Sequence, residues 1–171
     1  METSNQPQVS TLCCGWSHVA LLTGTVTRYK ELAVKYNQRA DARQVLVWGR
    51  NNYGQLGLQH TSNVRRPVPL QDPPWSENER VEMLSVASES TFVLLGMKNP
   101  ILGPLEHSTH APPGSGILYA TGWNEHGNLG VGDTADRHSF APVLGDARTA
   151  VEYIWSGSAH SFVQVSTRMD V

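Results

Sequence analysis

Apolar residues along the chain gather in short runs that are separated by polar or glycine-rich stretches. The runs are rich in branched and aromatic residues and have the length of strands, and two of them alternate roughly between apolar and polar positions, which is typical of half-buried strands. The pattern therefore predicts an all-β chain of short strands. These segments are 45–48, 81–87, 91–95, 117–120, 151–155 and 161–165.

One segment is written twice, at 45–58 and 118–131, with an offset of 73 positions. The shared residues are of the types that shape turns, and such self-similarity indicates a repeat architecture. The identical pairs are Gly49 and Gly122, Asn51 and Asn124, Gly54 and Gly127, Leu56 and Leu129, and Gly57 and Gly130.

Two further elements recur outside this segment. Residues 66–68 are echoed at 141–143, and residues 87–94 line up with 156–163; the latter element has a third copy at 14–21. We therefore expect five parts. These are a closing half-repeat at 1–22, an insertion at 23–43, a whole repeat or blade at 44–95, a flexible Pro/Gly loop at 96–116, and a whole repeat with a C-terminal tail at 117–171.

The glycine-rich stretch in each repeat is expected to be a tight turn. Each glycine in a helix interior would cost roughly 1 kcal/mol relative to alanine, whereas glycine reaches positive φ in a turn without a clash. Asn51 and Asn124 suit the same turn, and Leu56 and Leu129 are expected to pin it to the core. Two strands, a turn and two strands predict one four-stranded antiparallel sheet per repeat, arranged as in a β-propeller.

The motifs at 48–58, 14–22 and 122–130 resemble the signature halves of the regulator of chromosome condensation repeat. The last is similar to members described as secretion-regulating guanine nucleotide exchange factors and as fungal α-tubulin suppressors. The resemblance implies a seven-bladed propeller, of which about two and a half blades are present. Its structural signature residues are Gly15, His18, Trp48, Gly49, Asn51, Gly54, Leu56, Gly57, Gly122, Asn124, Gly127, Leu129, Gly130, Gly157 and His160.

The chain departs from the repeat pattern at two places and is too short to close a ring. Thr121 stands where Trp48 does, and residues 87–91 lack the glycine and histidine of their sister segments. A propeller needs four or more blades. We therefore expect a part of a longer protein; the alternatives are an assembly of several chains, or an open stack with exposed edges.

The two insertions, at 23–43 and 96–116, occupy the same junction and should project from the same face. The first has apolar residues at helical spacing, which predicts a short amphipathic helix. Both fit tolerated surface loops, because long loops cost little extra closure entropy. Alternatively, basic residues of the first contact an acidic partner such as a tubulin tail or a GTPase surface: Arg28, Lys30, Lys35, Arg39 and Arg43.

Composition narrows the class of partner. A net charge of −2 lacks the basic face that nucleic-acid binding needs, so a nucleic-acid partner is not expected. Residues 1–10 are polar and no apolar run reaches the ~20 residues that span a membrane, so neither a signal peptide nor a membrane partner is expected. Cys13 and Cys14 are adjacent and should point to opposite faces, which favours a reducing cytoplasmic or nuclear compartment.

The histidines do not form a catalytic pattern. His18 and His160 recur with the repeat, so we predict that each makes a buried hydrogen bond to backbone. His107 and His110 lie in a proline-rich stretch without a cysteine or carboxylate cluster, so no metal site is predicted there.

Other motifs that could suggest a binding site are better explained by a structural role. Asp133 and Asp136 lack the register and distal glutamate of a calcium loop and are predicted to cap a turn. The glycines of 122–130 are not followed by the Lys-Ser/Thr of a phosphate-binding loop. We therefore predict no catalytic, cofactor-binding or metal-binding residues and no small-molecule substrate. The expected function is non-catalytic binding of a protein partner through loops; the alternative, from the resemblance, is guanine nucleotide exchange on a small GTPase.

Overall fold

The computed structural model describes residues 9–23, 44–76, 79–97, 116–144 and 149–167, and all its regular elements in these ranges are strands. None of these elements is a helix that could span a membrane. The predicted helix in 23–43 lies almost wholly outside the described residues. The strands are β1 (Val9–Cys14), β2 (His18–Thr23), β3 (Val45–Gly49), β4 (Val64–Pro69), β5 (Glu79–Val86), β6 (Ser90–Met97), β7 (Leu118–Gly122), β8 (Arg137–Leu144), β9 (Thr149–Ser156) and β10 (Ser161–Thr167).

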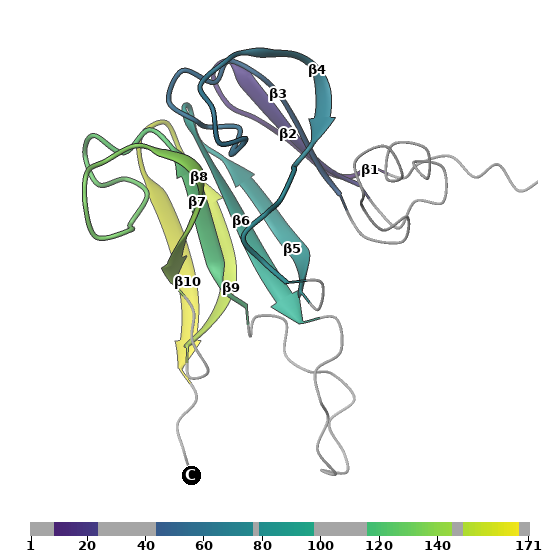
Figure 1. Ribbon diagram of the computed structural model, residues 1–171. Helices are drawn as coiled ribbons and strands as arrows, with labels where there is room; N and C mark the ends of the chain where they lie inside the picture. Colours follow the sequence, from purple (N-terminus) through teal and green to yellow (C-terminus); the bar gives the residue numbers. More distant parts are fainter. Residues whose placement is uncertain (1–8, 24–43, 77–78, 98–115, 145–148, 168–171) are drawn as a thin grey trace, which may run out of the picture.

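The strands form three antiparallel sheets that follow one another along the chain (Figure 1). The first sheet has the order β1-β2-β3-β4 and the second has the order β5-β6-β7-β8. The third is the pair β9 and β10. The predicted fold class, an all-β partial propeller of about two and a half four-stranded blades, is confirmed.

The membership of each sheet differs from the prediction. The four strands of residues 44–95 were expected in one sheet, but β3 and β4 belong to the first sheet and β5 and β6 to the second. Prolines give a physical reason: Pro67 and Pro69 in β4 have no N–H to offer another neighbour, so β4 is an edge strand. Each complete blade therefore joins the closing hairpin of one repeat to the opening pair of the next.

A hydrophobic core fills the space between the first and second sheets. Val47 of β3 and Val93 of β6 are fully buried in it, and Leu56 inserts from the loop between β3 and β4. Phe140 of β8 completes this core, and its ring meets Trp75 edge-on at 5.5 Å between centroids. Each such side chain contributes about 1.5–3 kcal/mol when it is fully buried.

A second core lies between the second and third sheets. Phe92 of β6 and Leu118 of β7 pack there with Val151 and Ile154 of β9. Leu129 inserts from the loop between β7 and β8 and is 1% exposed, so it repeats the role of Leu56. The same contact between sheets thus occurs twice in the described chain.

The three hairpin turns are closed by the same backbone hydrogen bond. It runs from Gly15 N to His18 O, from Ala87 N to Ser90 O and from Gly157 N to His160 O, each at 2.8 Å. Ala87 therefore corresponds to Gly157, one residue away from the predicted alignment. A Cβ on Gly15 would lie 2.5 Å from Ala87 O and 2.6 Å from Cε1 of His18, and a Cβ on Gly157 would lie 2.5 Å from Nε2 of His160. The middle copy has Ser90 in place of the histidine, so no imidazole ring stands against Ala87. The loss of glycine and of histidine in the middle copy is one coupled change.

Two equivalent loop glycines differ in their surroundings. Gly54 and Gly127 have φ of 79° and 72°, in the left-handed region that disfavours other residues. A Cβ on Gly54 would lie 2.6 Å from the carbonyl oxygen of Arg137, because β8 packs against this loop. At Gly127 the nearest atom to such a Cβ is the Asp133 oxygen at 3.9 Å.

We predict that Gly54→Ala destabilises the chain more than Gly127→Ala does. Backbone strain alone costs roughly 1 kcal/mol at either site. The clash at Gly54 adds about 1–3 kcal/mol of overpacking. Urea denaturation followed by circular dichroism measures both losses, and equal losses would contradict the contact between Gly54 and β8.

Candidate protein-binding surface

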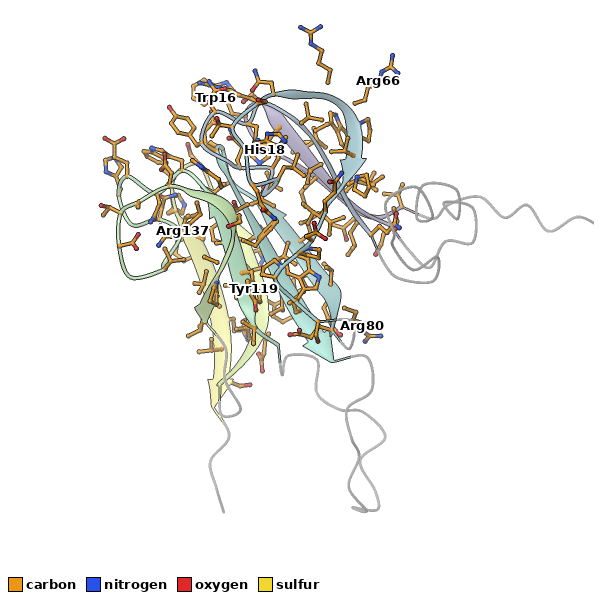
Figure 2. All side chains as sticks on the ribbon, viewed as in Figure 1. Trp16, His18, Arg66, Arg80, Tyr119 and Arg137 are labelled. Atoms are coloured by element: carbon orange, nitrogen blue, oxygen red, sulfur yellow. The ribbon has the colours of Figure 1, made fainter. Side chains whose placement is uncertain are left out.

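The hairpin turns and the glycine-rich loops meet at one end of the sheets, termed the turn end (Figure 2). Backbone bonds join successive parts: Arg50 N donates to Ser17 O at 2.8 Å, and Trp123 N donates to Glu89 O at 2.9 Å. The turn end is therefore one continuous surface. It consists of residues 15–17, 50–63, 87–89, 123–136 and 157–160.

The loop after β3 is organised around the buried side chain of Asn51. Its Oδ1 accepts a hydrogen bond from Leu56 N at 2.9 Å, and its Nδ2 donates to His60 O at 2.6 Å. Its backbone N donates to Oδ1 of Asn63 at 2.8 Å. One asparagine thus holds both arms of the loop and directs Leu56 into the core.

The loop after β7 repeats this arrangement. Oδ1 of Asn124 accepts from Leu129 N at 2.9 Å, and its Nδ2 donates to Asp133 O at 2.8 Å. Asp136 Oδ1 accepts from Asn124 N at 2.7 Å. A hydrogen bond from Arg137 holds the pKa of Asp133 below its usual range. Both aspartates therefore stabilise the loop through hydrogen bonds to Asn124.

Glu89, in the turn between β5 and β6, ties the first loop to the second sheet. Its carboxylate accepts a hydrogen bond from Nε2 of the buried Gln55. It also pairs with Nη1 of Arg50 at 3.3 Å. Charge-assisted bonds of this kind are stronger than neutral ones, so Glu89 fixes the loop that carries Arg50 and Gln55.

His18 makes a buried contact between the first two sheets. The Thr91 hydroxyl donates to Gln55 O at 2.7 Å and lies 3.0 Å from Nε2 of His18, so Nε2–H donates to that hydroxyl. The expected partner was backbone; the partner of Nε2 is a side chain of the neighbouring sheet. Burial lowers the pKa of His18 to about 4.

His160 occupies the same position in the third hairpin but is exposed. Its ring meets Phe162 edge-on, with 5.3 Å between centroids. The sequence predicted one buried role for both histidines. The two differ because His18 faces Thr91 of a following sheet, and the described residues provide no such sheet beyond the third.

The substitution of threonine for tryptophan at 121 also has a structural reason. Thr121 is fully buried, and its hydroxyl lies 2.9 Å from Gly54 O and 2.7 Å from Arg137 O. It therefore contacts the loop of the first sheet from the second. Trp48 is half-buried on the face of the first sheet that points away from the second.

Aromatic side chains lie along the turn end. Trp16 is 82% exposed. Arg50 lies over the half-buried ring of Tyr53, with 5.8 Å to its centroid. Trp123 donates from Nε1 to Glu125 at 3.3 Å and contacts the ring of His126 edge-on.

Trp16 was not among the predicted binding residues, although a signal was present. The hairpin bonds show that its equivalents are Ser88 and Ser158. A tryptophan among small turn residues marks a position where the fold does not require a large side chain. The basic residues predicted to bind a partner, from Arg28 to Arg43, lie outside the described residues.

The insertions leave the sheets at the end opposite Trp16. Thr23 N donates to Gln44 O at 2.9 Å where the first insertion begins and ends. Leu95 N donates to Ile117 O at 3.1 Å at the base of the second. The two predicted projections therefore start from equivalent places.

Repeated four-stranded sheets with Asn-centred loops define the class of protein as a repeat-built β-propeller, here a partial one. The chain matches the Regulator of chromosome condensation (RCC1) repeat over residues 44–94 and 115–164. It belongs to this family.

Three curated relatives illustrate the similarity. The Ultraviolet-B receptor UVR8 of Arabidopsis thaliana is 34% identical over 94 residues, 55% of this chain and 17% of the relative. The X-linked retinitis pigmentosa GTPase regulator of Homo sapiens is 30% identical over 129 residues, 75% of this chain and 9% of the relative. The Secretion-regulating guanine nucleotide exchange factor of Bos taurus is 28% identical over 156 residues, 90% and 28% respectively. The chain spans less than a third of each relative.

A solved structure gives the same fold. The crystal structure of Kap60 bound to yeast RCC1 (Prp20) matches 96% of this chain and 29% of that chain, with a TM-score of 0.55 and 18% sequence identity. At this identity the match supports the fold alone. The similarity to fungal α-tubulin suppressors stays a prediction.

We predict that His18 makes the chain less stable as the pH falls from about 6.5 to about 4. The folded pKa is about 4 and the model-peptide value is 6.5, so in this window only the unfolded state gains the proton. The shift corresponds to roughly 3 kcal/mol at most, and below about pH 4 the loss levels off. Urea denaturation across this range measures it.

His18→Gln should remove this component of the pH dependence. His160→Gln is the matched control, because it changes the exposed equivalent. An unchanged pH dependence in His18→Gln would contradict the buried neutral state of His18.

Proposed function

We propose that this chain is a non-catalytic protein-interaction module that binds a partner protein at the turn end, with Trp16 as the anchor. The main observation in support is that Trp16 is 82% exposed at a position where the two equivalent hairpins have serine. Tryptophan is among the residues most enriched at binding hot spots.

The backbone around Trp16 is held in place. Trp16 N donates to Ser88 O at 3.1 Å, and Gly15 N closes the turn to His18 O at 2.8 Å. Burial of His18 fixes the base of the same turn. A large side chain on a fixed turn loses little conformational freedom when it binds, which favours affinity.

Tyr53 and Trp123 extend the surface on either side of the contact between Arg50 and Glu89. The backbone N of Arg50 donates to the carbonyl of Ser17, the residue after Trp16. The backbone N of Trp123 donates to the carbonyl of Glu89. The aromatic positions thus lie on loops that are fixed to one another. Aromatic residues combined with arginine are characteristic of interface centres.

The basic insertion is a second proposed contact. Arg28, Lys30, Lys35, Arg39 and Arg43 are proposed to meet an acidic surface on a small GTPase or a tubulin-related protein. The insertion is attached at the end opposite Trp16. The two contacts are therefore separable by mutation.

Guanine nucleotide exchange on a small GTPase is the alternative function. The similarity to the secretion-regulating guanine nucleotide exchange factor, which covers 90% of this chain, favours it. Release of a fluorescent nucleotide from a panel of small GTPases tests it directly. Faster release with any member of the panel would favour exchange over simple binding.

We also propose that the protein works in the cytoplasm, the nucleus or both. Cys13 donates from Sγ to Leu84 O at 3.3 Å, Cys14 is exposed on the other face, and both are free thiols. Free adjacent thiols suit a reducing compartment. Microscopy of the tagged chain in cells tests this proposal.

Trp16→Ser tests the interaction proposal, because serine is the residue of the equivalent turns. Proteins captured by the wild-type chain are identified and purified, and their binding is titrated. We expect Trp16→Ser to weaken binding at least tenfold. Leu144→Ser, which also removes an exposed apolar side chain, is the control and should leave binding unchanged. Equal affinities for wild type and Trp16→Ser would overturn the assignment of the turn end.

A further inference from the structure

The third sheet exposes large aromatic side chains on the face that points away from the second sheet. Tyr153 is 49% exposed, Trp155 is 52% exposed and Phe162 is 63% exposed. Trp155 and Phe162 are directly opposite each other on β9 and β10. The rings of Tyr153 and Trp155 stack at 5.6 Å between centroids.

The internal repeat shows what this face is built to contact. The pair Trp155 and Phe162 corresponds in register to Ser85 and Phe92 of the second sheet. Phe92 is only 2% exposed, because its face is covered by the third sheet. The equivalent face of the second sheet is covered by the sheet that follows it. The aromatic face of the third sheet is therefore suited to packing against another sheet in the same way.

The first sheet exposes the complementary face. Leu12, paired with Leu21, corresponds in register to Leu84 of the second sheet and Ile154 of the third. Leu84 and Ile154 are 6% and 4% exposed, because each packs on the sheet before it. Leu12 is 57% exposed and Val9 is 58% exposed.

We propose that these two faces bind each other between two copies of this chain, with the third sheet of one copy packed on the first sheet of the next. The contact repeats the two sheet-to-sheet contacts inside the chain. The backbone bonds also form a series: Trp16 N donates to Ser88 O, and Ser88 N donates to Ser158 O. The next bond in the series runs from Ser158 N to the Trp16 carbonyl of the second copy.

The polar groups of the two faces are compatible with a contact between two copies of the chain. In the second sheet the hydroxyls of Thr91 and Thr121 bond to the loop carbonyls of Gln55 and Gly54. At the same register positions the first sheet carries Val19 and Trp48. These apolar side chains need no loop carbonyl. In the described residues the third sheet carries no such loop, so the contact leaves no threonine hydroxyl unpaired at these two register positions.

The two faces differ, so the association is head-to-tail rather than symmetric. The exposed apolar side chains are aromatic on the third sheet (the aromatic face) and aliphatic, Val9 and Leu12, on the first sheet, where Trp48 is half-buried (the aliphatic face). A head-to-tail contact continues until a ring closes or a filament grows. The weight-average mass of the full chain should therefore rise beyond that of a dimer as its concentration rises.

Sedimentation velocity of the full 171-residue chain tests the proposal. Phe162→Asp disables the aromatic face and Leu12→Asp disables the aliphatic face, so each variant alone should associate at least tenfold more weakly than wild type. Mixed in equal amounts, they retain one intact face each and should form a dimer that grows no further. If Phe162→Asp does not fold, Phe162→Ala is used in its place. Alanine is the residue at the equivalent position of the first sheet, Ala20.

Leu144→Ala is the matched control, because Leu144 is an exposed apolar side chain (39%) on β8 of the second sheet and belongs to neither face. It should leave the association unchanged. A wild-type chain that stays monomeric at high concentration would overturn the proposal. So would a symmetric contact, in which Phe162→Asp dissociates the assembly while Leu12→Asp and the mixture behave as wild type.

Discussion

The close approach of an opening strand to the preceding hairpin is the constraint on which the structure depends. Gly49 pairs with His18, and Gly122 pairs with Ser90. Both glycines have φ of 112°, and a Cβ on either would lie within 2.6 Å or 2.8 Å of the paired Cα. Only glycine combines this backbone conformation with so short a separation. The glycine thus attaches each repeat to the one before it.

This attachment determines how the sheets are connected. Because β3 is bound to β2, the rest of its repeat must leave through the proline-containing edge strand β4 and begin a new sheet at β5. Each repeat therefore contributes to two blades. His18, Thr91 and the carbonyl of Gln55 then join neighbouring sheets through buried polar groups. Hydrophobic burial holds the sheets together, while these bonds fix their relative positions.

The sequence predicted the repeat, the number of blades and six of the ten described strands, because apolar periodicity and turn glycines are local signals. No strand range was predicted for β1, β2, β4 or β8. It did not predict which strands share a sheet, because antiparallel pairing within a repeat and between repeats gives the same pattern. Pro67 and Pro69 were the available clue. The candidate surface was even harder to predict from the sequence. The importance of Trp16 depends on its 82% exposure, and the different environments of His18 and His160 depend on whether another sheet follows.

The central claim is that a blade joins the closing hairpin of one repeat to the opening pair of the next. Nuclear Overhauser contacts between backbone protons test it most directly. The account predicts cross-strand contacts between residues 18–22 and 45–49, and between 90–94 and 118–122. Contacts that instead join β4 to β5 in one sheet would contradict it.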